Sequence, residues 1–183
     1  MNTMTSREVE PEAIPFKLNG KDVVGRSDET IIQTAQRLGV EIPHLCYKEG
    51  MRPEGNCRAC VVEVKGERVL AASCCRKPAA GMEVTSDSAR ARASQKMVLE
   101  LLLSDMPDSA YRLDSELDRW ARKLDVGMPR FARREQPEAD VSHHGITVRL
   151  DACIQCTRCL RACREEQVND VIGYAFRAEH SKI

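Results

Sequence analysis

Nine cysteines constrain this chain more than any other feature, because eight of them fall into two tightly spaced groups of four, and the ninth, Cys75, stands beside Cys74. The first follows the pattern C-x10-C-x2-C-x13-C and consists of Cys46, Cys57, Cys60 and Cys74. The second follows C-x2-C-x2-C-x3-C and consists of Cys153, Cys156, Cys159 and Cys163. Thiolates are soft ligands that suit iron–sulfur clusters, and close spacing lets one loop wrap one cluster. The spacing therefore predicts two iron–sulfur sites in a protein that carries electrons.

The first group suits a 2Fe–2S cluster, which needs two thiolates on each iron. Cys46, Cys57 and Cys60 share one loop, and Cys74 follows the next hairpin. Gly50 and Gly55 allow that loop to bend around a cluster. A structural zinc site is the alternative, because C-x-x-C is also half of a zinc ribbon.

Other side chains near the cysteines are weighed against simpler roles. We expect Cys75 to be a small buried thiol rather than an exchanged ligand. His44 could ligate iron, but four cysteines are already present, so we expect it to pack or hydrogen-bond near the loop. Arg58 either offsets cluster charge or is solvated. No metal is assigned to the remaining histidines, which are His143, His144 and His180.

The second group is the ligand run of bacterial 4Fe–4S ferredoxins. In two-cluster ferredoxins the fourth cysteine ligates the other cluster. We therefore expect Cys153, Cys156 and Cys159 to serve one 4Fe–4S cluster, and Cys163 to ligate a second cluster or to complete the first. No further cysteine precedes Ile183, so we expect the missing ligands to lie beyond this end of the chain.

The pattern of elements up to residue 88 predicts a β-grasp ferredoxin. Residues 1–13 are polar and predict a disordered tail. Two apolar runs around Asn19-Gly20 predict a hairpin with a type I′ turn. A helix is expected over 27–39, with Ser27 or Asp28 at its start. After the cysteine loop, a second hairpin turns near Lys65-Gly66, and a short strand at 82–84 completes the set.

The remaining chain predicts two helices and a second cysteine domain. Residues 89–105 favour helix, and a further helix near 109–124 has one apolar face. The fold class is therefore α+β. We expect a 2Fe–2S ferredoxin-like domain at 14–88, a helical connector at 89–126, a linker at 127–141 and a partial 4Fe–4S ferredoxin-like domain at 142–183.

Composition excludes several other functions. The 28 basic and 28 acidic residues balance, and only seven aromatic residues are present (3 Phe, 3 Tyr and 1 Trp), which argues against a nucleic-acid surface. No stretch approaches the roughly 18 apolar residues of a membrane span. No secretory signal is visible, so we expect a cytoplasmic protein. The sequence lacks nucleotide-binding and hydrolase motifs, and we assign no catalytic residue.

These residues resemble a known set of proteins. PHLCYKEGMRPEGNCRACVVEV and ASCCRKPAAGMEV resemble the N-terminal 2Fe–2S domain shared by the complex I large iron–sulfur subunit, the diaphorase small subunit of NAD-linked hydrogenases and iron-only hydrogenases. LDACIQCTRCLRACREEQVNDVIG looks like the first half of their two-cluster domain. SARARASQKMVLELLLSDMPD and ACREEQVNDVIGYAFRAEHSKI bring the chain nearest to the alpha subunit of NAD-dependent molybdenum or tungsten formate dehydrogenases.

The resemblance implies a particular role. Residues 76–152 contain no cysteine, so the His-plus-three-Cys cluster of complex I and iron-only hydrogenases cannot form, which favours formate dehydrogenase. In that family, electrons pass from a formate-oxidising centre elsewhere in the alpha subunit to flavin- and NAD-binding partner subunits. The alternatives are the small iron–sulfur subunit of a hydrogenase diaphorase or NADH:quinone oxidoreductase, and a zinc-stapled interaction module.

Overall fold

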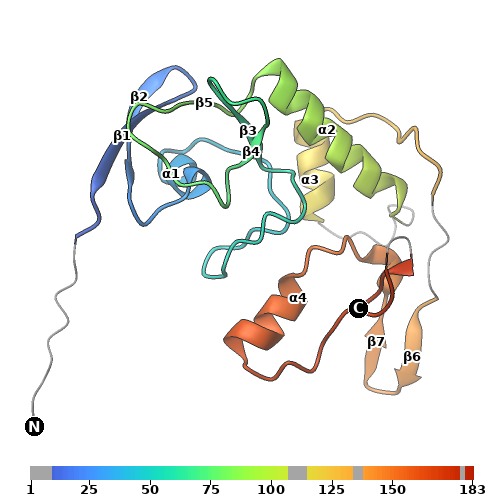
Figure 1. Cartoon of the computed structure of the whole chain (residues 1–183). Helices are drawn as coiled ribbons and strands as arrows, with labels where there is room; N and C mark the ends of the chain where they lie inside the picture. The colour runs from blue at the N-terminus through green and yellow to red at the C-terminus, as the bar shows by residue number, and fades with distance from the viewer. Residues whose placement is uncertain (1–9, 107–114, 134–137, 178–179) are drawn as a thin grey trace, which may run out of the picture.

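The structure is a computed structural model that describes residues 10–106, 115–133, 138–177 and 180–183. A five-stranded mixed sheet with strand order β2-β1-β5-β3-β4 forms its N-terminal part (Figure 1). β1 runs parallel to β5, and the other neighbouring strands are antiparallel. The strands are β1 Ala13–Leu18, β2 Lys21–Arg26, β3 Val61–Val64, β4 Ala71–Ala72 and β5 Glu83–Thr85.

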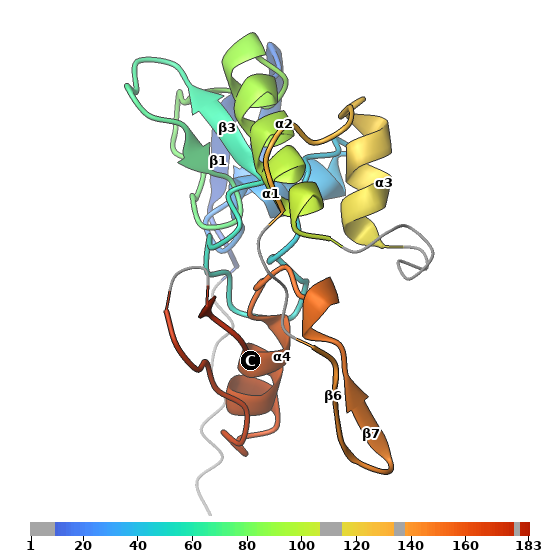
Figure 2. The ribbon, with the colours of Figure 1, turned by 90° about the vertical axis from the view of Figure 1, so that its right-hand side faces the viewer.

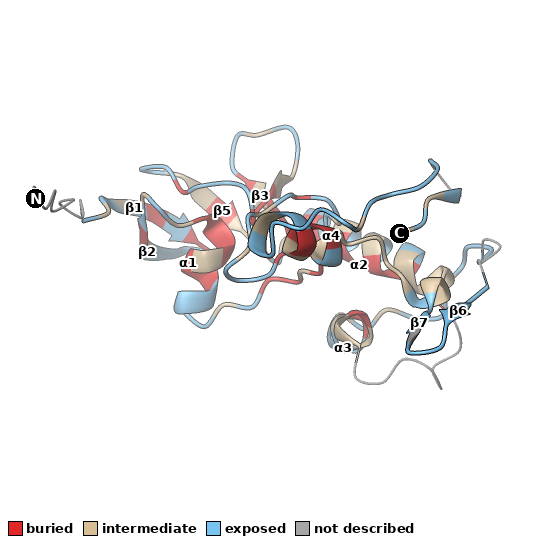
Figure 3. Cartoon of the chain, turned by 90° about the horizontal axis from the view of Figure 1, so that it is seen from below, coloured by how far each residue is buried: buried red, intermediate tan, exposed pale blue. Residues whose placement is uncertain are grey.

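Helix α1, Ile31–Arg37, packs its apolar side against this sheet. Ile31, Ile32 and Ala35 are fully buried, and they share one core with Phe16 and Val62. Buried residues gather between α1 and the strands, whereas the outer surfaces are exposed (Figure 3). The predicted α+β ferredoxin-like fold is therefore confirmed for this part of the chain.

The local signals at the first hairpin and helix had different outcomes. Asn19 and Gly20 both have positive φ, 52° and 78°, which is the type I′ turn that was predicted. The predicted helix start at Ser27 or Asp28 is wrong. Thr30 is the N-cap instead, and its backbone N–H donates to the Gln33 side chain at 2.8 Å. This reciprocal capping stabilises a helix start three residues after Ser27. A prediction that takes the first Ser or Asp as the cap misses it.

Helices α2, Ala89–Ser104, and α3, Glu116–Lys123, form a second layer beside the sheet (Figure 2). Ser88 and Ser115 cap them, since each hydroxyl accepts a backbone N–H of the first turn. Leu99 and Leu117 pack with Leu45 and Ala59 of the first cysteine loop. The predicted helix at 109–124 therefore begins at Glu116 within the described residues, and positions 109–114 lie outside them.

The C-terminal part contains a hairpin and the second cysteine loop (Figures 1 and 2). The antiparallel pair of β6 and β7 begins at Asp140, near the end of the predicted linker at 127–141. Among the described residues, no helix combines the length and hydropathy needed to cross a membrane. The elements are β6 Asp140–His143, β7 Ile146–Val148, the 3-10 turn Leu150–Ala152, α4 Arg158–Arg161 and the π-helical turn Ala162–Glu166.

Candidate metal centres

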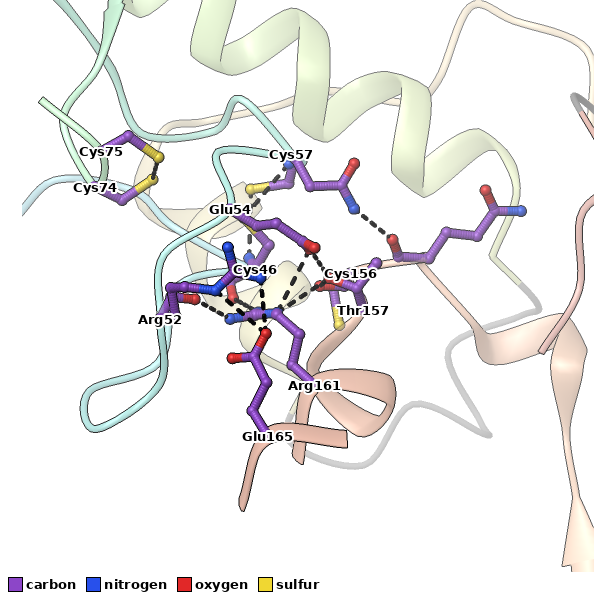
Figure 4. Close-up of polar contacts among 12 residues, drawn as sticks. Cys46, Arg52, Glu54, Cys57, Cys74, Cys75, Cys156, Thr157, Arg161 and Glu165 are labelled. Atoms are coloured by element: carbon purple, nitrogen blue, oxygen red, sulfur yellow. Dashed lines mark hydrogen bonds and ion pairs between the residues drawn. The ribbon is translucent and has the colours of Figure 1, made fainter. Parts of the chain in front are cut away.

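Three cysteines of the first group lie in the loop between α1 and β3, and Cys74 lies in the loop after β4. Figure 4 shows Cys46, Cys57 and Cys74 on these loops, with helix α2 nearby. Cys46, Cys60 and Cys74 are buried, and Cys57 is partly buried. The backbone N–H of Cys46 lies 3.4 Å from the sulfur of Cys57, and the N–H of Cys57 lies 3.5 Å from the sulfur of Cys46. The two residues are therefore held as a reciprocal pair.

The four thiols interact through hydrogen bonds, which shows that their sulfurs are neighbours. Hydrogen bonds from Cys57 and Cys74 lower the pKa of Cys46 to about 2. A hydrogen bond from Cys74 lowers the pKa of Cys60 to about 7. The same bonds, with burial, raise the pKa values of Cys57 and Cys74. A thiolate among these sulfurs is stabilised by its neighbours, which is the state that binds metal.

The arrangement fits a two-iron cluster. Hydrogen bonds link Cys57 to Cys46, Cys46 to Cys74 and Cys74 to Cys60, so four thiols lie together, which is two for each iron. No three His, Cys, Asp or Glu side chains within the described ranges are grouped as ligands of a single metal ion. Gly50 and Gly55 have φ of 82° and 65°, a left-handed backbone that glycine adopts readily and that lets the loop bend.

The residues beside the ligands lie partly as expected. Cys75 is exposed, so the prediction of a buried thiol is wrong. Its N–H donates to the Ala72 carbonyl at 3.0 Å in the turn after β4, which leaves the Cys75 side chain at the surface beside the buried Cys74. His44 packs near the loop as predicted, with Nδ1 2.8 Å from the Ile42 carbonyl oxygen. Arg58 is exposed.

Three thiols of the second cysteine group, Cys153, Cys156 and Cys159, are neighbours. Burial raises the pKa of Cys156, and the nearby sulfurs of Cys153 and Cys159 raise it further. The same three sulfurs, after burial, contribute to raising the pKa of Tyr174 to about 12. Cys163 is buried on the following turn, where its sulfur accepts the N–H of Val171 at 3.3 Å.

Two arginines of α4, which the sequence analysis missed, join the two cysteine groups. Arg158 donates to the Tyr47 carbonyl at 2.6 Å. Arg161 donates to the Cys46 carbonyl (Figure 4). Asn56 also donates to the Gln155 carbonyl at 2.9 Å. The only sequence signal for Arg158 and Arg161 was their position between cysteines of the second group. A cavity of about 720 Å³ lies between the loops at 54–58 and 154–157.

The fold and the paired thiols define an α+β ferredoxin-like domain for a 2Fe–2S cluster. Residues 11–89 match the family model described as a 2Fe-2S iron-sulfur cluster binding domain. The chain is similar to the G subunits of NADH-quinone oxidoreductase from Rickettsia felis and from Rickettsia bellii, with 29% identity over 176 residues. Each match covers 93% of this chain but 26% of the relative, so the chain spans about a quarter of these relatives.

A solved structure shares this architecture. The crystal structure of an NAD+-reducing NiFe hydrogenase in the H2-reduced state matches with a TM-score of 0.83 and 26% identity. The match covers 92% of this chain and 73% of that chain. The comparisons confirm an iron–sulfur protein related to subunits of NAD-linked oxidoreductases.

Proposed function

We propose that this chain is the iron–sulfur electron-transfer part of an NAD-linked oxidoreductase, with a 2Fe–2S cluster on Cys46, Cys57, Cys60 and Cys74. The pairwise contacts of these four thiols, inside the matched domain at 11–89, carry the proposal. A bound cluster supplies one-electron redox chemistry. The chain holds the thiols, buries three of them away from water and directs the Cys46 and Cys57 amides toward sulfur.

We propose that the cysteines of the second group ligate two different 4Fe–4S clusters. Cys153, Cys156 and Cys159 would ligate one cluster, because the sulfurs of Cys153 and Cys159 lie close enough to Cys156 to help raise its pKa. Cys163 would ligate a second cluster, because its sulfur lies on the next turn and contacts Val171 instead. The domain boundaries at 14–88, 89–126, 127–141 and 142–183 belong to the same proposal.

The parent enzyme is proposed to be an NAD-dependent molybdenum or tungsten formate dehydrogenase. The resemblance of its sequence and the absence of cysteine at 76–152 support this choice. Its partners would be flavin- and NAD-binding subunits and the rest of the alpha subunit, in the cytoplasm. The second candidate is an iron–sulfur subunit of an NADH:quinone oxidoreductase or a hydrogenase diaphorase, which the named relatives favour.

Metal analysis with EPR tests the proposed site. The 183-residue chain is purified without oxygen and reduced with dithionite. We expect a 2Fe–2S signal that disappears in Cys57→Ser. Bound zinc without iron would contradict the proposal and favour the zinc-stapled module.

A separate assay distinguishes the parent enzymes. We expect the natural full-length protein to contain molybdenum or tungsten and to reduce NAD+ with formate. NADH:quinone or hydrogen-dependent activity without either metal would select the second candidate.

A further inference from the structure

Arg161 is a buried cation that reaches from the second cysteine group into the first. It ends α4, two residues after Cys159 and two before Cys163. Its side chain is only 4% exposed. Burying a guanidinium costs free energy unless its donors and its charge are compensated, so a full set of partners is expected.

The donors of Arg161 are satisfied by the first cysteine loop and by its own turn. One terminal nitrogen donates to the Cys46 carbonyl, and the other donates to the Arg52 carbonyl at 2.6 Å. Nε donates to the Thr157 hydroxyl at 3.2 Å. Figure 4 shows the guanidinium between these groups. The planar fork of arginine therefore fixes two points of the first loop to α4.

The charge of Arg161 is compensated less completely than its donors. Glu54 lies 3.5 Å from Nε, but its side chain is 37% exposed and it also accepts the Thr157 hydroxyl. Glu165 also interacts electrostatically with Arg161, but it is ion-paired with Arg52 at 2.8 Å. Both oxygens bonded to the terminal nitrogens are neutral carbonyls. Positive charge therefore remains beside Cys46, where four thiolates and two sulfides would give a 2Fe–2S centre a net negative charge.

We propose that Arg161 is a positioning residue that locks the two cysteine sites together and raises the reduction potential of the first. The inference rests on the proposed 2Fe–2S site. Reduction adds negative charge, so a buried cation favours the reduced form, and burial weakens the screening by water. Arg158 reinforces the lock through the adjacent Tyr47 carbonyl.

The midpoint potential of the 2Fe–2S EPR signal tests this role in the 183-residue chain. We expect Arg161→Gln to make reduction roughly tenfold less favourable, a fall of about 59 mV for a one-electron couple. Arg164→Gln is the matched control, because it removes the same charge from an exposed side chain paired with Asp170 at 2.7 Å. Arg161→Lys keeps the charge without the fork and is expected to recover at least half of the shift.

Glu54→Gln distinguishes an effect of charge on the potential from an effect of a loosened contact between the two cysteine sites. Because it removes a negative charge facing the same guanidinium, we expect it to raise the potential while Arg161→Gln lowers it. Shifts of the same sign in these two variants, or an Arg161→Gln shift no larger than the Arg164→Gln control, would overturn the inference. If Arg161→Gln lost its cluster, the midpoint potentials of Glu54→Gln and Arg161→Lys would test the inference instead. A fall in the potential of Glu54→Gln would then overturn it. A wild-type chain without a 2Fe–2S signal would overturn the proposed function, and this inference with it.

Discussion

Cys74 and Cys75 are consecutive, and their sulfurs lie 3.6 Å apart, yet only Cys74 is buried among the other thiols. We therefore expect Cys74→Ser to lose most of the 2Fe–2S content, whereas Cys75→Ser retains it. Iron and sulfide analysis with EPR on both variants checks this difference. Equal loss in the two variants would show that Cys75 also ligates the cluster.

The second cysteine group predicts a divided response to substitution. When the chain is reconstituted with a small thiol that fills the open ligand position, we expect a 4Fe–4S centre to form. Cys156→Ser should abolish this centre. Cys163→Ser should retain that centre, because the Cys163 sulfur lies on the following turn, where it accepts the Val171 N–H. Absorption and EPR spectra report the content, and equal loss in both variants would mean that Cys163 completes the first cluster.

Gln95 ties helix α2 to the sheet through its buried amide. Its Nε2 donates to the Val61 carbonyl at 2.8 Å and to the Ser86 carbonyl at 3.1 Å. Gln95→Leu removes a donor from both buried carbonyls, and we expect a loss of about 1–3 kcal/mol in the free energy of unfolding. Denaturant unfolding followed by circular dichroism measures it. Met97→Leu, at a 39% exposed position of the same helix, is the control and should change stability little.

Glu100 predicts a pH-dependent contribution to stability. Arg130 donates to this carboxylate from Nε at 2.7 Å and from its backbone N–H at 3.0 Å, and lowers the pKa of Glu100 from 4.5 to about 2. Because the folded pKa is depressed, the contribution is present above about pH 4.5 and is lost as the pH falls toward about 2.

Comparison with Glu100→Gln isolates this contribution. The wild-type protein should melt at a higher temperature than the variant at pH 6, and the difference should shrink below pH 4.5. Measuring both proteins at each pH removes effects of acid on the clusters that they share. A difference that stays constant through this range would mean that the ion pair does not contribute as described.

Local sequence signals predicted more of the fold than of the contacts between its parts. Asn19-Gly20 identified a turn because both residues accept positive φ. The cysteine spacing predicted which thiols lie together, because most cysteines of each group share a single loop. The bond from Arg161 to Cys46 joins residues 115 positions apart, so no local pattern encodes it. The exposure of Cys75 likewise depends on the turn after β4.

A redox titration of the 183-residue chain tests the central claim most directly. The account predicts a reversible one-electron couple whose reduced form gives the 2Fe–2S EPR signal, and whose signal is absent in Cys57→Ser but present in Cys75→Ser. A chain that holds zinc and shows no reversible couple would contradict it.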